Sequence, residues 1–163
     1  MDGVSMNQRN AKLRHYFEGF KSYRSSKDNR AVQIVKDLYT GGSCSIAYLH
    51  HNVIAVKSSL GIYAFSLGGW KTVTTGTAIK ALTPWSWHYS RGKLKQVIRG
   101  KVTAKHEIPN KGFVVLDEPN KSLGQSALQY KNTTLYFPTL NETMDYMFEA
   151  DNGYRCWLDS GRS

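Results

Sequence analysis

The sequence predicts an α+β fold: a strongly twisted antiparallel sheet, with a basic helix before it and an amphipathic helix after it. Apolar residues recur with a helical period near both ends of the chain and with a period near two through its middle. The chain has 163 residues, of which 40% are hydrophobic and 12% aromatic. It is long enough for one hydrophobic core and too apolar for a disordered protein. We therefore expect one domain over residues 1–163, built from a helical basic segment (1–42), a β-rich core (43–137) and an acidic helix with a tail (138–163).

Two helices are expected in the first segment. Residues 8–24 place five apolar side chains on one helical stripe with cations on its flanks. Residues 31–39 carry apolar side chains at 31, 34, 35 and 38, and Gly41 and Gly42 follow as a stop. These patterns predict a long basic helix and then a short one.

The period then changes towards two, which predicts strands. Three short β-prone runs with polar turns between them favour an antiparallel meander, and these runs span 44–51, 52–57 and 61–67. A brief helical turn through Leu82, capped by Thr74 or Thr75, is closed by Pro84. Further strands are expected at 94–105, 112–116 and 133–137. A five-stranded barrel is one form that such a sheet could take.

The C-terminal helix has the clearest local signal. Thr139 and Glu142 have the spacing of a capping box, and apolar residues follow at helical spacing from Leu140 to Phe148. Asn152 and Gly153 predict a turn into residues 154–158, which form either a last strand or a docking tail.

The charge is uneven along the chain. The net charge is +10, and residues 1–106 hold 17 basic residues against four acidic ones. Between Leu38 and His106 there is no carboxylate, whereas nine lysines or arginines lie there. Because a surface made only for solubility mixes both signs, this pattern favours a polyanionic partner.

Residues 85–105 give that surface a regular spacing. Every lysine and arginine in this stretch is at an odd position, while Leu94, Ile98 and Val102 are at even positions. In an extended chain these two sets lie on opposite faces. A turn at residues 99–100 would bring Ile98 and Lys101 to one face, so we favour a single long strand, bent at Gly100, that presents a cationic ribbon.

Aromatic residues directly precede this ribbon, and cations combined with stacking rings are typical of proteins that hold single-stranded nucleic acid. The candidate nucleic-acid-binding residues are Trp85, Trp87, Tyr89, Arg91, Lys93, Lys95, Arg99, Lys101 and Lys105, with Lys71, Arg9, Lys12 and Arg14 in second rank. In the alternative interpretation, the two tryptophans point into the core and Gly92 is a bulge that reverses the faces.

Motifs of catalysis and metal binding are not found in the sequence. It lacks C-x-x-C, H-E-x-x-H, EF-hand, P-loop and G-x-G-x-x-G patterns. Cys44 and Cys156 are expected to be buried free thiols. We therefore expect no enzyme, cofactor or metal site. Because no secretory signal or bilayer-spanning stretch is recognised, we expect a cytoplasmic protein without a membrane partner.

The segment Gly68-Gly69-Trp70-Lys71-Thr72-Val73-Thr74-Thr75 resembles a G-G-W-x-T-x-T-T segment in small proteins of tailed bacteriophages. The resemblance covers residues 49–82, and this chain departs from it at Gly76 and Thr77, where those proteins carry a basic and a polar residue. It implies a viral origin, a small strand-rich module and the cytoplasm of a bacterial host.

Two functions are then expected to compete. The first is a non-catalytic binder of single-stranded DNA or another polyanion, which would serve replication or transcription beside a polymerase or replication protein and could assemble as a homo-oligomer. The second is a host-takeover or anti-defence protein that docks its basic surface on a host protein and inhibits it.

Overall fold

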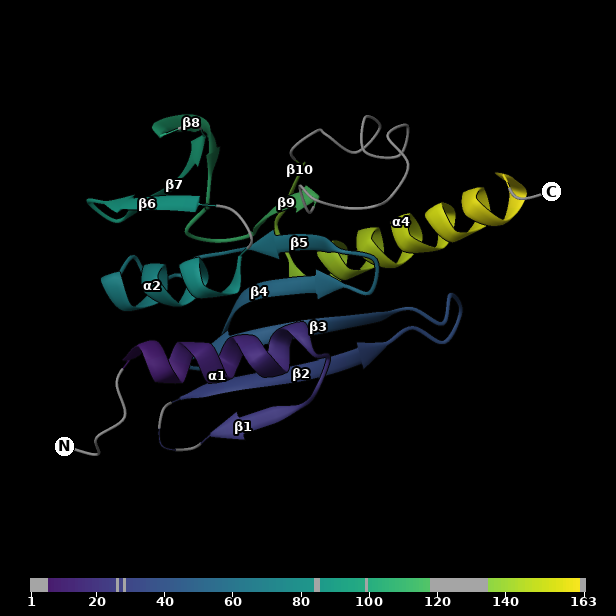
Figure 1. Ribbon diagram of the computed structural model, residues 1–163, viewed down its shortest axis with the longest axis horizontal. Coiled ribbons are helices and arrows are strands. Elements are labelled where there is room, and N and C mark those ends of the chain that lie inside the picture. The colour runs from purple at the N-terminus through teal and green to yellow at the C-terminus, as the bar shows by residue number, and fades with distance from the viewer. Residues whose placement is uncertain are drawn as a thin grey trace.

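The structure, a computed structural model, describes residues 6–25, 27, 29–83, 86–98, 100–117 and 135–161. Its elements are shown in Figure 1 and are, in chain order, α1 (Met6–Glu18), β1 (Tyr23–Ser25), β2 (Arg30–Lys36), β3 (Ser43–Leu49), β4 (Asn52–Ser58), β5 (Ile62–Phe65), α2 (Val73–Leu82), β6 (Ser86–Ser90), β7 (Lys93–Ile98), β8 (Lys101–Glu107), β9 (Phe113–Asp117), β10 (Leu135–Phe137) and α4 (Leu140–Gly161). The α+β prediction is confirmed, with a helix at each end.

The strands form two antiparallel sheets. The larger sheet has the order β1-β2-β3-β4-β5-β9-β10, and the smaller one the order β6-β7-β8. Because β1 and β10 are edges that do not pair with each other, the larger sheet is open and is not closed into a barrel. The predicted meander is confirmed in β3, β4 and β5, and the β3–β4 turn has positive φ at His50 and His51, as a two-residue type I′ turn requires.

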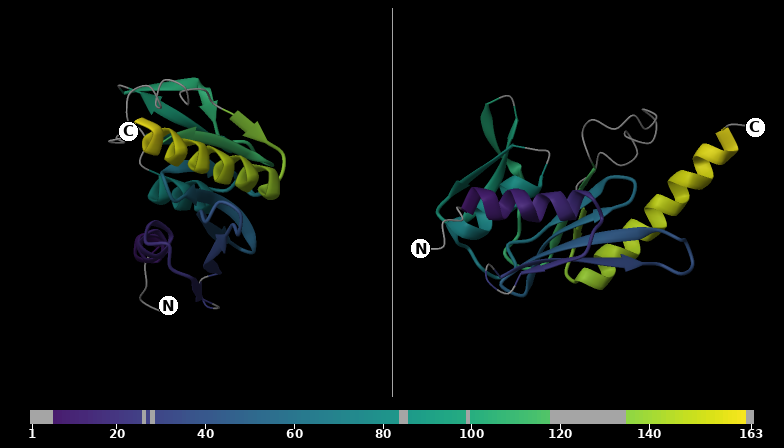
Figure 2. Two further views of the ribbon diagram at one scale, coloured as in Figure 1. Left: turned by 90° about the vertical axis from the view of Figure 1, so that its right-hand side faces the viewer. Right: turned by 60° about the horizontal axis from the view of Figure 1, so that its bottom comes forward.

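The larger sheet separates two hydrophobic clusters. Helices α1 and α2 and the smaller sheet cover one face, where Leu13, Phe17, Ile79 and Trp87 are buried with inward residues of the strands. Helix α4 covers the other face through Met147 and Phe148. Figures 1 and 2 show α4 on the side of the sheet opposite to α1. The helices that the structure describes are therefore divided between the two faces, with α1 and α2 on one side and α4 on the other.

Helix α1 ends earlier than predicted. The chain leaves the helix at Glu18, and Phe20 takes a φ of 53° as the backbone reverses. The reversal brings Tyr23 into β1, where its ring stacks on that of Tyr16 at a centroid distance of 4.6 Å. The apolar stripe of residues 8–24 therefore belongs partly to the helix and partly to an edge strand.

The short helix predicted at residues 31–39 is wrong, and the helical basic segment 1–42 is thus partly strand. Residues Arg30–Lys36 form β2 and pair with β3 along their full length. Val32 faces the cluster under α1, whereas Val35 faces the cluster under α4. A strand that is covered on both faces carries apolar residues on both. The resulting spacing of apolar residues in β2 resembles that of a helix, which is why the sequence predicted one. Leu38, expected on the helix, is 96% exposed in the turn after β2.

The single strand predicted over residues 94–105 is also wrong. Strands β7 and β8 pair as a hairpin in which Ile98 is opposite Lys101, and Gly100 has a φ of 78° in the turn. Only glycine takes this conformation without strain, so the bend expected at Gly100 is a full chain reversal.

The tail predicted at residues 154–158 is part of α4, which continues through Asn152 and Gly153 to Gly161. Its capping residue is as expected, because the Thr139 hydroxyl accepts a hydrogen bond from the Glu142 amide at 3.2 Å. Farther along, the buried Asp151 carboxylate accepts hydrogen bonds from the hydroxyls of Ser58 and Ser59 at 3.0 and 3.1 Å. This contact fixes the helix to the β4–β5 turn just where the sequence predicted a break.

Candidate nucleic-acid interface

Helix α1 turns its apolar stripe towards the sheet and its cations outwards. Leu13 and Phe17 are fully buried, whereas Lys12 and Arg14 are exposed and Arg9 is half-buried. The periodicity of residues 8–24 predicted this division, and the structure confirms it for the helical part.

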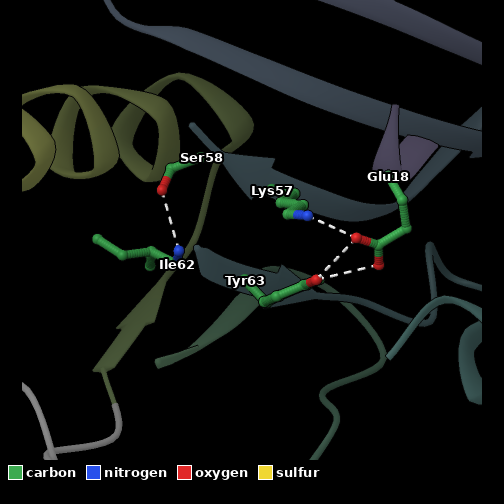
Figure 3. A network of polar contacts seen from close by, with 5 residues as sticks. All are labelled: Glu18, Lys57, Ser58, Ile62 and Tyr63. Carbon is green, nitrogen blue, oxygen red and sulfur yellow. Dashed lines mark hydrogen bonds and ion pairs between the residues drawn. The ribbon is translucent and has the colours of Figure 1, made fainter. Parts of the chain in front are cut away.

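The acidic residue of α1, Glu18, is already paired. Its carboxylate forms an ion pair with Lys57 of β4 and accepts hydrogen bonds from the Tyr63 hydroxyl at 3.0 and 3.1 Å. Figure 3 shows these contacts beside the bond from the Ile62 amide to the Ser58 hydroxyl. Because Lys57 and Tyr63 satisfy Glu18, its charge does little to offset the exposed cations of the helix.

Helix α2 lies beside α1 and has no acidic residue. Its capping residue is Thr72, whose hydroxyl accepts a hydrogen bond from the Thr75 amide at 3.2 Å, so neither Thr74 nor Thr75 has the predicted role. Its Lys80 is exposed near the C-terminal end, where a positive charge also interacts favourably with the helix dipole.

The β6–β7 hairpin is attached to α2 through Tyr89. The Tyr89 ring packs so closely on Gly76 that a Cβ atom there would lie 2.8 Å from the ring. The Tyr89 hydroxyl donates a hydrogen bond to the Lys71 carbonyl at 2.9 Å. Tyr89, predicted as a stacking residue, is thus half-buried and positions the hairpin on the helix.

The predicted cationic ribbon with all cations on one face is wrong. Lys93 and Lys95 share a face with Val97, and Val97 is paired with Val102. Lys101, which is next to Val102 in β8, therefore lies on the opposite face, although it is exposed. The acidic Glu107 lies directly opposite Lys95, which is half-buried.

Arg91 lies in the turn between β6 and β7. Arg91 and Gly92 have φ angles of 54° and 77°, which are those of a type I′ turn, and Ser90 pairs with Lys93 on either side of it. Gly92 is thus a turn residue and not a bulge. The turn exposes Arg91 and Lys93 together at the end of the hairpin.

Trp87 belongs to the core and is not available for stacking. It is 7% exposed, its indole nitrogen donates a hydrogen bond to the Thr83 hydroxyl at 3.0 Å, and its ring meets Phe65 edge to face. The alternative interpretation of the sequence is therefore correct for this tryptophan. Trp85, Arg99 and the side chain of Lys105 lie outside the described part of the chain.

A different tryptophan, Trp70, lies on the surface beside the hairpin. It is 55% exposed in the loop before α2, and the Gly69 amide ties this loop to the Asn110 carbonyl at 2.7 Å. The next residue, Lys71, approaches the hairpin turn, because a Cβ on Gly92 would lie 3.3 Å from that of Lys71. Trp70 is not among the residues predicted from the sequence, although its position between two glycines and a lysine indicates a loop.

These residues form a surface across α1, α2 and the β6–β7 turn, which we call the cationic surface. It comprises Arg14, Lys80, Lys71, Arg91 and Lys93, with Trp70 at the junction of α2 and the hairpin. Lys12 does not belong to this surface, because its ammonium group lies over the Tyr23 ring of β1, 5.5 Å from the ring centroid. The exposed acids Glu142, Asp145 and Glu149 are on α4, on the far side of the larger sheet. The larger sheet therefore separates these three acids of α4 from the cationic surface, while the exposed Glu107 of β8 lies in the smaller sheet.

A concave region lies along the β1 edge of the larger sheet. This groove of about 1510 Å³ has no acidic residue among its described lining residues. It combines the exposed Lys21, Arg24 and Lys36 with the half-buried rings of Tyr16 and Phe20. Cations and aromatic rings therefore occur together in this groove as well.

The Cys44 thiol is a potentially reactive group of the described residues, and it is buried. Burial raises the pKa of the Cys44 thiol to about 12, with smaller contributions from Asp151 and Asp37, so this thiol stays protonated at neutral pH. No group of three or more potential metal ligands is found among the described residues. Within the same part of the chain, no helix combines the length and the apolar character needed to cross a bilayer.

Comparison of the chain with protein-family models, with curated proteins and with solved structures gave no significant match.

Proposed function

We propose that the protein is a non-catalytic nucleic-acid-binding protein that prefers single strands and binds them on the cationic surface. The observation that supports this most is the position of Trp70, a tryptophan 55% exposed beside Lys71 and the turn that carries Arg91. An indole ring can stack on any unpaired base while neighbouring cations neutralise the phosphates on either side of it.

The distribution of charge supports the same conclusion. Lysines and arginines of α1, α2 and the hairpin turn face outwards, and the acid of α1 is paired with Lys57. Each phosphate that such a surface neutralises releases counterions, so affinity should fall steeply with salt. A duplex keeps its bases stacked and leaves little for Trp70 to contact, which is why we expect a preference for single strands.

The test is fluorescence anisotropy with labelled single-stranded and duplex DNA of equal length, titrated at several salt concentrations. The main variant is Lys71→Glu with Lys93→Glu, two exposed residues of the cationic surface. The matched control is Lys21→Glu with Arg24→Glu in the β1 groove, which changes the net charge by the same amount. Thermal unfolding of both variants verifies that they fold.

We expect tighter binding to the single strand, and a much larger loss of affinity and of salt dependence in the first variant than in the control. An equal loss in both variants would mean that only the net charge matters, which would contradict the proposal. A loss confined to the control would instead place the binding site in the β1 groove. Binding that shows no preference for single strands would also contradict the proposal.

A further inference from the structure

The outer edge of β2 is only partly covered by β1 (Figure 1). β1 pairs with residues 30–32, and no described strand pairs with that edge farther along β2. The chain that leads into β1 does not extend the pairing, because the Lys21 amide donates its hydrogen bond to the Tyr16 carbonyl of α1 at 3.0 Å. The larger sheet therefore has an open edge along residues 33–36, and this edge lines the β1 groove.

The main-chain groups of Ile34 and Lys36 point out of this open edge. In an antiparallel ladder, successive residues direct their N–H and C=O groups to opposite sides of the strand. The Asp37 amide, which follows β2, donates to the Gly42 carbonyl at 2.9 Å, so the odd-numbered residues of β2 direct these groups to β3. The even-numbered residues direct theirs outwards. The first two of them face β1, which leaves the N–H and C=O groups of Ile34 and Lys36 without a described strand partner.

Half-buried apolar side chains flank the open edge on both faces of the sheet. Ile34 and Tyr16 pack against the cluster under α1, and Val35 and Tyr48 pack against the cluster under α4. An added strand would cover these side chains further, with its alternate residues on the two faces. The volume of the β1 groove, about 1510 Å³, also exceeds the usual range of small-molecule pockets. The groove therefore suits an extended chain better than a small molecule.

The charge along the β1 groove favours an acidic strand. Its described lining residues include the exposed Lys21, Arg24 and Lys36 and no acid. A second copy of β2 would bring the same cations against these, so the charges oppose edge-to-edge pairing of two copies. The exposed acids of α4 are in a helix and cannot supply a strand. An extended acidic segment of another protein has the complementary sign of charge.

We propose that the open edge of β2 binds an extended acidic segment of a partner protein, which adds to the larger sheet as a further strand. The main chain of this segment exchanges hydrogen bonds with Ile34 and Lys36, and its carboxylates meet Lys21 and Arg24. A nucleic-acid strand matches the edge less well, because its backbone lacks regular N–H donors for the two outward carbonyls. The inference goes beyond the proposed function, since none of these residues belongs to the cationic surface.

The test is fluorescence anisotropy with a labelled peptide of about eight residues in which glutamate and valine alternate. Two matched peptides carry either lysine in place of glutamate or a methyl group on every main-chain amide nitrogen. The main variant is Lys21→Glu with Arg24→Glu. The control is Lys101→Glu with Lys111→Glu, two exposed lysines outside the groove and outside the cationic surface, which changes the net charge by the same amount. Thermal unfolding verifies that both variants fold.

We expect the acidic peptide to bind at least about tenfold more tightly than either matched peptide. The main variant should lower its affinity by a similar factor, and the control should bind it as the unmodified protein does. The comparison of peptides uses the unmodified protein, so it decides the matter even where a variant does not fold.

Amide hydrogen exchange, followed by two-dimensional ¹H–¹⁵N NMR, locates the bound peptide. The peptide should slow exchange of the Ile34 and Lys36 amides about tenfold or more, because it supplies the acceptors that they lack. The Val35 amide, which is directed to β3, should change much less. Equal slowing of all three amides would mean general stabilisation without pairing at the edge, and it would overturn the inference.

Three further results would overturn it: no binding of the acidic peptide, equal binding of the N-methylated peptide, or equal losses in the two variants. Displacement of the peptide by a single-stranded oligonucleotide that leaves exchange at Ile34 unchanged would make the groove a polyanion site, which also contradicts the inference. The outcome is separate from that of the proposed function, because Lys71→Glu with Lys93→Glu leaves the β1 groove intact.

Discussion

Trp70 and Trp87, the tryptophans whose side chains the structure describes, should respond to alanine substitution in opposite ways. Trp87 is 7% exposed and bonded to Thr83, whereas Trp70 is 55% exposed. Truncation of a buried tryptophan costs about 3–5 kcal/mol of unfolding free energy through lost burial and the cavity that remains. The lost hydrogen bond to Thr83 is worth about 1 kcal/mol, which places Trp87→Ala in the upper part of that range.

The contrast is large compared with the stability of the whole domain. Since a domain of this kind unfolds with about 5–15 kcal/mol, Trp87→Ala should remove about a quarter or more of that stability, or abolish folding. Trp70→Ala should change the free energy of unfolding by less than about 0.5 kcal/mol, because the side chain is largely exposed. It should instead weaken single-strand binding by about 1–3 kcal/mol, or about 5- to 150-fold.

Urea unfolding followed by far-UV circular dichroism gives the first pair of values, and anisotropy with a labelled single strand gives the second. The slope of affinity against salt should be almost the same for Trp70→Ala as for the unmodified protein, because no cation is lost. The reasoning would be refuted if Trp87→Ala kept normal stability. It would equally be refuted if a folded Trp70→Ala bound single strands with unchanged affinity.

Three further predictions follow from other contacts. A Gly→Ala change inside a helix ordinarily stabilises it by about 1 kcal/mol. Gly76→Ala should instead lower the urea midpoint of unfolding, because the added Cβ would lie 2.8 Å from the Tyr89 ring. A raised midpoint would show that the hairpin moves freely. Asp151→Ala removes the carboxylate that holds α4 to the β4–β5 turn. It should lower the free energy of unfolding by about 1–3 kcal/mol in the same assay. An unchanged midpoint would mean that α4 is held by apolar contacts alone. In a Cys156→Ser variant, Cys44 should not react with a thiol reagent at pH 8 in the folded protein and should react once unfolded, because its pKa is raised to about 12. Because folding disfavours the Cys44 thiolate, the free energy of unfolding should fall as pH rises from about 9 towards 12. A Cys44 thiol that is readily labelled at pH 8 in the folded protein would contradict this reasoning.

Local patterns in the sequence were sufficient for much of the fold. The basic helix α1, the meander of β3 to β5 and the capped start of α4 all follow from periodicity and turn chemistry within a few residues. His50 and His51, for example, lie where two short β-prone runs meet, and they form the turn between β3 and β4. The uneven charge was also visible in the sequence, because it depends on the order of the residues and not on the fold.

The sequence could not decide which partner each segment would meet. Residues 31–36 look helical in isolation, and they become a strand because β3 pairs with them and because helices cover both faces. The alternation of residues 85–105 is real, but reversals at Gly92 and at Gly100 divide it among β6, β7 and β8. Lys101 consequently lies on the opposite face of the smaller sheet from Lys93. Register depends on contacts between segments, so a face predicted from one strand can be lost in a hairpin.

The candidate sites show the same division. The sequence by itself determined that this protein is strongly basic over its first two thirds and that aromatic residues accompany the cations. Only the tertiary structure decided that Trp87 is buried against Phe65, that Trp70 is exposed beside Lys71, and that Asn10 accepts a hydrogen bond from Arg30. Exposure and hydrogen-bond partners are set by residues distant in sequence, because a side chain is buried only when another element packs over it.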